Sequence, residues 1–249
     1  EVHIYDLCIL SSGANSHLAD GHFDGRVRRP YTWGCLWTTF KLPDGLSPNM
    51  LHQRCHGAKK MMGILPVSRL HDGYEAALYW SAKVQDLKGM DARQFSAIKD
   101  EINHFWPEAT LSLEPLQYAN FIAATYNDIW TPKPFKGRLI AIGDIAHATS
   151  PQLGQGCTMA LLDAWLLAKA IQRNKPQLHD AVAQWWHARR YQLAYVRHLS
   201  RLLTPLYQSE NKLNGVWRDK LMAPMARVPW FYQLQLKTLA SEVFLKPLK

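Results

Sequence analysis

The alternation of apolar and polar residues predicts a strand-rich first half and a helix-rich second half of the chain. Five stretches have the length and the two-residue period of β-strands, at residues 2–10, 31–40, 61–67, 74–81 and 121–130. In the second stretch, Trp33, Cys35, Trp37 and Thr39 fall on one face. Turn sequences at residues 43–45 and 71–73 separate neighbouring strands, which predicts a mostly antiparallel sheet.

Helical periodicity appears in three further places. Residues 91–106 carry an apolar face with Asp91 as its N-cap, and residues 155–171 form a longer apolar helix. After residue 176 the pattern is helical almost throughout, and Pro205 should break or bend this run. The chain is therefore expected to be α/β in the broad sense (α+β), with helices toward its C-terminus.

The most informative segment is the apolar run 137–142, which ends in Gly143 and Asp144. It places one carboxylate at the carboxyl end of a buried strand, where open α/β sheets bind ligands. Such a carboxylate can hold a hydroxyl group of a sugar or a polyol. Pro151 then sets a rigid turn, while Gly154 and Gly156 lack the Cβ atoms that would keep a flat ligand from the backbone.

The helix that follows begins near Gln155 with free backbone amides. These amides, together with the positive end of the helix dipole, favour a ligand that gains negative charge. Apolar residues at helical spacing in this segment would also bury a face in any fold, so the helix alone does not establish a site.

The combined motif resembles the second flavin-binding motif of the class A flavoprotein monooxygenases, which have the p-hydroxybenzoate hydroxylase fold. The matching residues are Gly143, Asp144, Ala146, His147, Pro151, Gly154, Gln155, Gly156, Asp163 and Ala164. The resemblance implies that Asp144 contacts the ribityl hydroxyls of FAD. It also implies that the amides near Gly156, Cys157 and Thr158 face the isoalloxazine carbonyl. His147 could face the flavin or satisfy a loop carbonyl.

A second resemblance lies at residues 6–16, where Gly13 and Ser16 match a family segment that carries an acidic residue followed by an arginine. Here Ser12 replaces the acid and the arginine has no clear counterpart, which leaves NAD(P)H only a candidate electron donor. No Gly-x-Gly-x-x-Gly occurs in the 249 residues. We therefore expect the C-terminal portion of a longer flavoprotein, without the adenosine-binding lobe.

The resemblance implies four regions and one leading function. Residues 1–30 would be a remnant of the FAD-binding domain, 31–132 the substrate-domain sheet with one helix, 133–175 the FAD-binding strand, loop and helix, and 176–249 a C-terminal helical region. The function implied is hydroxylation or epoxidation of an aromatic or apolar small molecule with O2, through a flavin C4a-hydroperoxide. Reductases and halogenases share the scaffold, and a non-catalytic relative is a further alternative. No catalytic residue is indicated by spacing.

Four aromatic residues, Trp33, Trp37, Tyr79 and Trp80, could line a substrate pocket or pack in the core. His52 and His56 would share a strand face but lie too far apart to bind one ion, so no metal site is expected. The four cysteines have no paired spacing and indicate neither disulfides nor zinc.

The net charge of +9, from 29 basic and 20 acidic residues, is spread along the chain, and no nucleic-acid-binding module is present. We expect a cytoplasmic protein, since neither a signal peptide nor a spanning segment is indicated. The tail 224–249 combines aromatic and basic residues. It could contact a membrane surface, or it could pack on the flavin domain or on a second subunit of a homodimer.

Overall fold

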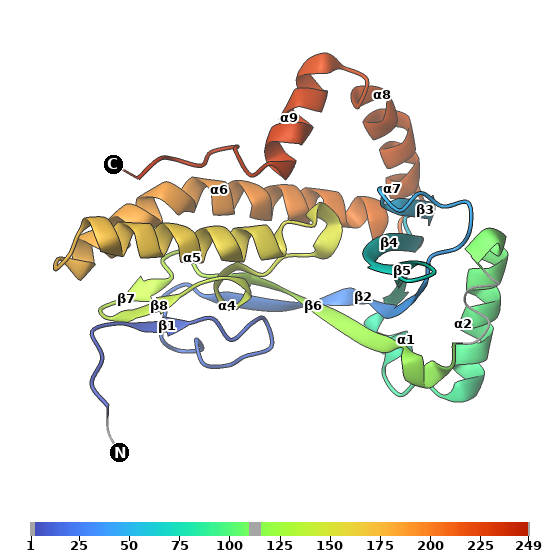
Figure 1. The fold of residues 1–249 in the computed structure, drawn as a ribbon, viewed down its shortest axis with the longest axis horizontal. Helices are drawn as coiled ribbons and strands as arrows, with labels where there is room; N and C mark the ends of the chain where they lie inside the picture. The colour runs from blue at the N-terminus through green and yellow to red at the C-terminus, as the bar shows by residue number, and fades with distance from the viewer. Residues whose placement is uncertain (1–2, 110–115, 249) are drawn as a thin grey trace. The chain divides into compact units, whose positions relative to one another are not determined.

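A computed structural model describes residues 3–109 and 116–248, and Figure 1 shows its two sheets and its helices. The strands are β1 (Cys8–Leu10), β2 (Val27–Lys41), β3 (His52–His56), β4 (Lys60–Leu70), β5 (Gly73–Lys83), β6 (Ile122–Trp130), β7 (Phe135–Lys136) and β8 (Leu139–Ala141). A five-stranded sheet has the order β3-β4-β5-β2-β6, and a three-stranded sheet has the order β1-β8-β7.

The helices concentrate in the second half of the chain. They are α1 (Val84–Leu87), α2 (Ala92–Phe105), α4 (Asp144–His147), α5 (Gly156–Arg173), α6 (Leu178–Tyr207), α7 (Lys212–Trp217), α8 (Ala223–Met225) and α9 (Pro229–Leu239). Short 3-10 turns occupy Pro107–Ala109, Tyr118–Asn120 and Pro151–Leu153, and a π-helical turn occupies Arg218–Met222. This mixture of an antiparallel sheet and C-terminal helices confirms the predicted fold class.

The chain divides into two compact units. The first comprises Glu1–Pro30, Tyr126–Thr204 and Arg218–Lys249, and we call it the loop unit because it contains the glycine loop. The second comprises Tyr31–Thr125 and Pro205–Trp217, and we call it the sheet unit.

In the sheet unit, neighbouring strands among β2 to β5 pair antiparallel, with Leu36 opposite Trp80 and Met62 opposite the same tryptophan. These side chains lie on the face that packs against α2, where Phe95 and Ile102 complete the core. Asp91 caps α2 as predicted: its carboxylate accepts the Gln94 amide at 2.8 Å, and the glutamine side chain accepts in return.

In the loop unit, β1 runs parallel to β8, and the helices α5 and α6 lie side by side in Figure 1. Their contact is apolar, with Leu166 and Ala170 of α5 packed among the same buried residues as Val182 and Trp185 of α6. The strand therefore feeds directly into the loop and helix that carry the predicted site.

The first predicted strand is shorter than expected. The strand predicted over 2–10 is limited to β1, because β8 offers only three paired positions and residues 3–7 have no strand partner in the described chain; residue 2 lies outside the described residues. Pro205, which was expected to break or bend the helical run, lies inside α6 shortly before the helix ends at Tyr207.

Candidate functional site

The carboxylate of Asp144 projects from a buried turn. The residues on either side, Gly143 and Ile145, are buried, whereas Asp144 is exposed at the start of α4. Gly143 has φ +68°, a conformation that side chains disfavour, and a Cβ added to it would lie 3.1 Å from the Cβ of Ala160. Glycine is therefore required here by both the backbone and the packing of α5.

The glycine loop brings a helix start to this carboxylate. Gly154 adopts φ +63° and donates its amide to the carbonyl of Pro151 at 2.9 Å, which closes the 3-10 turn. The chain then enters α5 at Gly156, where an added Cβ would lie 3.7 Å from Oδ1 of Asp144. Asp144 and Gly156, twelve residues apart in the sequence, are thus neighbours as the motif predicted.

The first amides of α5 are open to a ligand. The first hydrogen bond at this end runs from the amide of Met159 to the carbonyl of Gln155 at 2.9 Å. The amides of Gly156, Cys157 and Thr158 precede it, and the first two of these residues are exposed. An anionic or carbonyl oxygen near this helix end would be stabilised by the amides and the helix dipole.

Gln155 has a different position from the other loop residues. It is buried, and its Oε1 accepts a hydrogen bond from the Ser241 hydroxyl at 2.8 Å. Its side chain is therefore engaged by the C-terminal segment, and its part in any cofactor site would be through the backbone.

The buried carboxylate of Asp163, on α5, forms hydrogen bonds that fix the loop in place. Its Oδ2 accepts the amide of Gly143 at 3.0 Å and lies 2.5 Å from Nε2 of His147. Its Oδ1 accepts Nε of Arg189, from α6, at 2.8 Å. His147 thus contacts this carboxylate, which was neither of the two partners considered for it from the sequence.

The charge of Asp163 is matched by its neighbours. Complete burial alone would raise the pKa of Asp163, but the adjacent His147 imidazole and Arg189 guanidinium outweigh burial and lower it below its ordinary value. The carboxylate therefore stays ionised, and it fixes Gly143 and α4 relative to α5 and α6. The sequence marked Asp163 only as part of a motif and gave no sign of Arg189.

Arg26 supports α4 from the other side. Its side chain is almost fully buried, donates to the carbonyl of Ile145, and reaches the Thr131 hydroxyl at 3.0 Å. Its Nε also lies 3.2 Å from the Asp20 carboxylate. Sequence reasoning assigned no role to Arg26, which is one of three arginines within residues 26–29 and has no local feature that marks it as buried.

The four aromatic residues of the sheet unit do not form one pocket. Trp37 and Tyr79 are cross-strand partners on the face away from α2, together with Cys35. Trp80 lies on the opposite face, in the core, because consecutive residues of a strand point to opposite sides. Trp80 therefore packs in the core, which was one of the two alternatives for it, while Trp37 and Tyr79 share the opposite face of the sheet.

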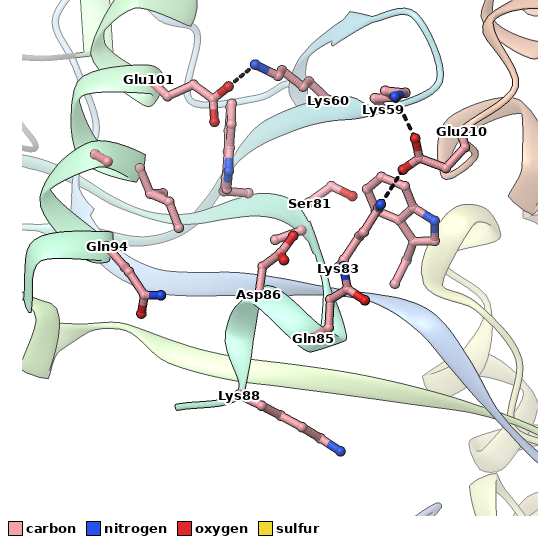
Figure 2. Close-up of a pocket in the computed structure, with 15 residues that line it drawn as sticks. Lys59, Lys60, Ser81, Lys83, Gln85, Asp86, Lys88, Gln94, Glu101 and Glu210 are labelled. Atoms are coloured by element: carbon pink, nitrogen blue, oxygen red, sulfur yellow. Dashed lines mark ion pairs between the residues drawn. The ribbon is translucent and has the colours of Figure 1, made fainter. Parts of the chain in front are cut away.

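Figure 2 shows a pocket of about 520 Å³ at the end of the sheet, lined by Trp33, Trp80 and several charged residues. Glu210 lies between Lys59 and Lys83, with oxygen to nitrogen distances of 2.5 and 2.7 Å. Hydrogen bonds from these two lysines lower the pKa of Glu210 to about 2. This pocket therefore combines paired charges with two tryptophans, and neither Trp37 nor Tyr79 lines it.

The histidines on β3 have separate surroundings. His52 is hydrogen-bonded to the carbonyl of Ser47 at 2.9 Å, and His56 is exposed at the other end of the strand. Across residues 3–109 and 116–248, no group of three or more histidine, cysteine, aspartate or glutamate side chains is arranged to hold a metal ion.

Known proteins resemble this chain over most of its length. A family model described as an FAD binding domain matches residues 26–193. The FAD-dependent urate hydroxylase of Mycolicibacterium vanbaalenii is 31% identical over 224 residues, covering 87% of this chain and 55% of that protein. A flavin-dependent monooxygenase from an unknown prokaryotic organism is 25% identical over 86% of this chain and 51% of its own length. The chain thus spans about half the length of these curated relatives.

Solved structures share the fold. Klebsiella pneumoniae HpxO complexed with FAD and uric acid aligns with a TM-score of 0.76 at 14% identity, covering 96% of this chain and 60% of that chain. PqsL, a probable FAD-dependent monooxygenase from Pseudomonas aeruginosa, aligns with a TM-score of 0.68 at 19% identity, over 85% and 59% of the two chains. These likenesses confirm the predicted p-hydroxybenzoate hydroxylase-like fold.

Proposed function

Because this chain belongs to the family of FAD-binding domains found in class A flavin-dependent monooxygenases, we propose that it is the catalytic portion of an enzyme that inserts one oxygen atom from O2 into an aromatic or apolar small molecule. The observation that carries this proposal is the exposed Asp144 carboxylate beside the open amides of α5.

The residues of this cradle fit FAD, which is the cofactor of the family. Asp144 would accept hydrogen bonds from the ribityl hydroxyls, because an ionised carboxylate has only acceptor oxygens. The amides of Gly156, Cys157 and Thr158 would donate to the ring carbonyl, while Gly154 and Pro151 border the approach. An added Cβ would meet nothing within 4 Å at Gly154 and only Oδ1 of Asp144, at 3.7 Å, at Gly156, so both glycines leave open space beside the carboxylate.

FAD, when bound, supplies the redox chemistry: it takes two electrons from a donor such as NAD(P)H and delivers one atom of O2 to the substrate, the other leaving as water. The protein's contribution would be positioning, exclusion of water and stabilisation of charge on the reduced ring by the α5 amides. Asp144 would hold the cofactor and take no part in proton transfer.

The face of the sheet opposite α2 supports an aromatic substrate. Trp37 and Tyr79 lie side by side there, and Trp37 is 37% exposed. Burial raises the pKa of Tyr79 to about 12, so its hydroxyl stays protonated and can donate to a carbonyl or a ring nitrogen. One relative is named a urate hydroxylase, and a flat, polar-edged heteroaromatic ring of that class would suit this pair.

The first test is a titration of the purified chain with FAD, followed by flavin absorbance and fluorescence. We expect saturable binding that Asp144→Ala weakens roughly 10- to 150-fold, because hydrogen bonds to a charged group contribute about 1.5–3 kcal/mol. The control is Asp180→Ala, which removes an exposed aspartate of α6 and should leave the affinity unchanged.

A second variant separates binding from folding. Gly156→Ala should lower FAD affinity while leaving the melting temperature unchanged or higher, because alanine favours a helix and meets only an ordinary contact. A folded chain that binds no FAD, or equal affinity in all variants, would overturn the assignment of this cradle.

The reaction itself is tested by NAD(P)H oxidation with candidate aromatic substrates and by product analysis under labelled O2. Incorporation of one labelled oxygen atom would support a monooxygenase. Flavin binding with NAD(P)H oxidation but no incorporation would indicate a reductase of the same scaffold, and a halide-dependent product would indicate a halogenase. Flavin binding without any turnover would indicate the non-catalytic relative. Each of the last three outcomes contradicts the proposed reaction.

A further inference from the structure

The C-terminal helix α9 exposes an unusual number of large apolar side chains. Trp230 is 66% exposed and Leu239 is 58% exposed, although both belong to an eleven-residue helix. Further exposed apolar residues of this region are Val228, Tyr232, Leu234, Leu236 and Phe244. Single exposed apolar residues are ordinary, but a contiguous group on one helix marks an interaction surface.

This helix is docked on α6 by a narrow contact. Phe231, Leu234 and Thr238 line an apolar cavity of about 330 Å³ whose other wall includes Tyr195 and Leu199 of α6. The Tyr195 and Thr238 hydroxyls are hydrogen-bonded at 2.8 Å, which anchors one end of the helix. In Figure 1, α8 and α9 (red) form a hairpin that meets α6 at the end of α9. Most of the helix circumference is therefore left uncovered by the loop unit.

The charge of this segment is one-sided. Residues 220–241 contain Lys220, Arg227 and Lys237 and no aspartate or glutamate. All three basic residues are exposed. Exposed aromatic and aliphatic side chains beside cations, without an anion between them, favour contact with an anionic lipid surface.

We propose that α8 and α9 form a docking surface for an anionic lipid bilayer. Trp230 and Leu236 would enter the boundary between headgroups and acyl chains, and the basic residues would contact lipid phosphates. The contact is peripheral, since no helix in the described part of the chain is long and apolar enough to cross a membrane. Leu245 of the tail does not take part, because it packs against the core between α5 and α6.

The test is cosedimentation of the protein with vesicles of phosphatidylcholine containing 30% phosphatidylglycerol, compared with pure phosphatidylcholine, at about 0.1 M salt. We expect binding to the anionic vesicles and much weaker binding to the neutral ones. Replacing Lys220, Arg227 and Lys237 together by glutamine should weaken binding on the order of 100-fold, because each basic residue near a membrane contributes about 1 kcal/mol, or roughly fivefold.

Apolar insertion is tested separately. Trp230→Ser should weaken binding to anionic vesicles, whereas Trp165→Ser, which removes an exposed tryptophan of α5 lying under Lys169, should not. Both sites are exposed, so the melting temperature should be unchanged in each variant.

Three results would overturn the proposal: no binding to anionic vesicles, equal binding to neutral ones, or equal loss in the two tryptophan variants. A concentration-dependent dimer that Trp230→Ser abolishes, with no vesicle binding, would instead make this face a subunit interface. None of these measurements requires bound FAD, so the membrane proposal and the proposed oxygenase activity can fail independently.

Discussion

The most informative perturbation of the fold is Asp163→Asn. The carboxylate is completely buried and accepts from the Gly143 amide, His147 and Arg189. Asparagine keeps the shape but removes the charge, and it turns one acceptor oxygen into a donor that must face another donor. Breaking a buried ion pair by removing one partner costs about 3–5 kcal/mol, because the other charge stays buried.

For a chain of this size, each kcal/mol lowers the melting temperature by roughly 2–4 °C, so Asp163→Asn should lower it by roughly 6–20 °C. The assay is thermal unfolding by circular dichroism, with Asp180→Asn, an exposed aspartate of α6, as the control. The control should lie within about 0.5 kcal/mol of the unchanged protein. A variant as stable as this control would refute the buried ion pair.

Asp163→Asn should also change how the free energy of unfolding depends on pH. The pKa of Asp163 is lowered in the folded protein, so its ionised form stabilises the fold above its ordinary value of 3.8. This stabilisation is lost as pH falls through the lower folded value. Below about pH 4, the free energy of unfolding should therefore fall less steeply with decreasing pH in Asp163→Asn. An identical slope in both proteins would contradict the direction of the pKa shift.

Three further predictions concern the loop, the sheet and the pocket of Figure 2. Gly143→Ala should destabilise the fold by about 1–3 kcal/mol, since the backbone conformation of Gly143 is open only to glycine. The loss should exceed that of Gly137→Ala, whose Cβ would meet nothing within 4 Å. Equal losses in chemical denaturation would contradict the close contact between Gly143 and Ala160. Gly63→Ala should displace the ring of Tyr79, whose Cζ would lie 2.0 Å from the added Cβ. This variant should bind an aromatic ligand more weakly and FAD equally well. Unchanged affinity for the aromatic ligand would exclude Tyr79 from the substrate face. NMR titration of the Glu210 carboxyl should give a midpoint near pH 2, and a midpoint near 4.5 would show that its lysine pairs are absent in solution.

The helices, the strands and the position of the glycine loop could be predicted from the local sequence. Asp91 predicted the start of α2, and Pro151 with Gly154 predicted the turn before α5, because capping and turn formation are properties of a few adjacent residues. The two-residue period likewise placed Trp37 on one face of β2. It could not place Trp80 with it, since grouping side chains across strands also requires the register.

Contacts between distant segments were beyond the reach of a single sequence. Arg189 lies 26 residues from Asp163, and Arg26 lies 119 residues from the carbonyl of Ile145 that it contacts. Sequence periodicity assigns neither arginine a contact, because it separates apolar from polar positions and carries no information about buried polar partners.

These buried partners bear on the cofactor-binding role that we propose for the exposed carboxylate of Asp144. Asp144 stands on a helix of only four residues, which has too few internal hydrogen bonds to hold its own position. Asp163 fixes the amide before it and His147 at the end of that helix, while Arg26 fixes the carbonyl directly after it. A ligand group held between charged, buried anchors loses little entropy on binding. The position of Asp144 is thus set by buried residues that lie behind the proposed ligand site.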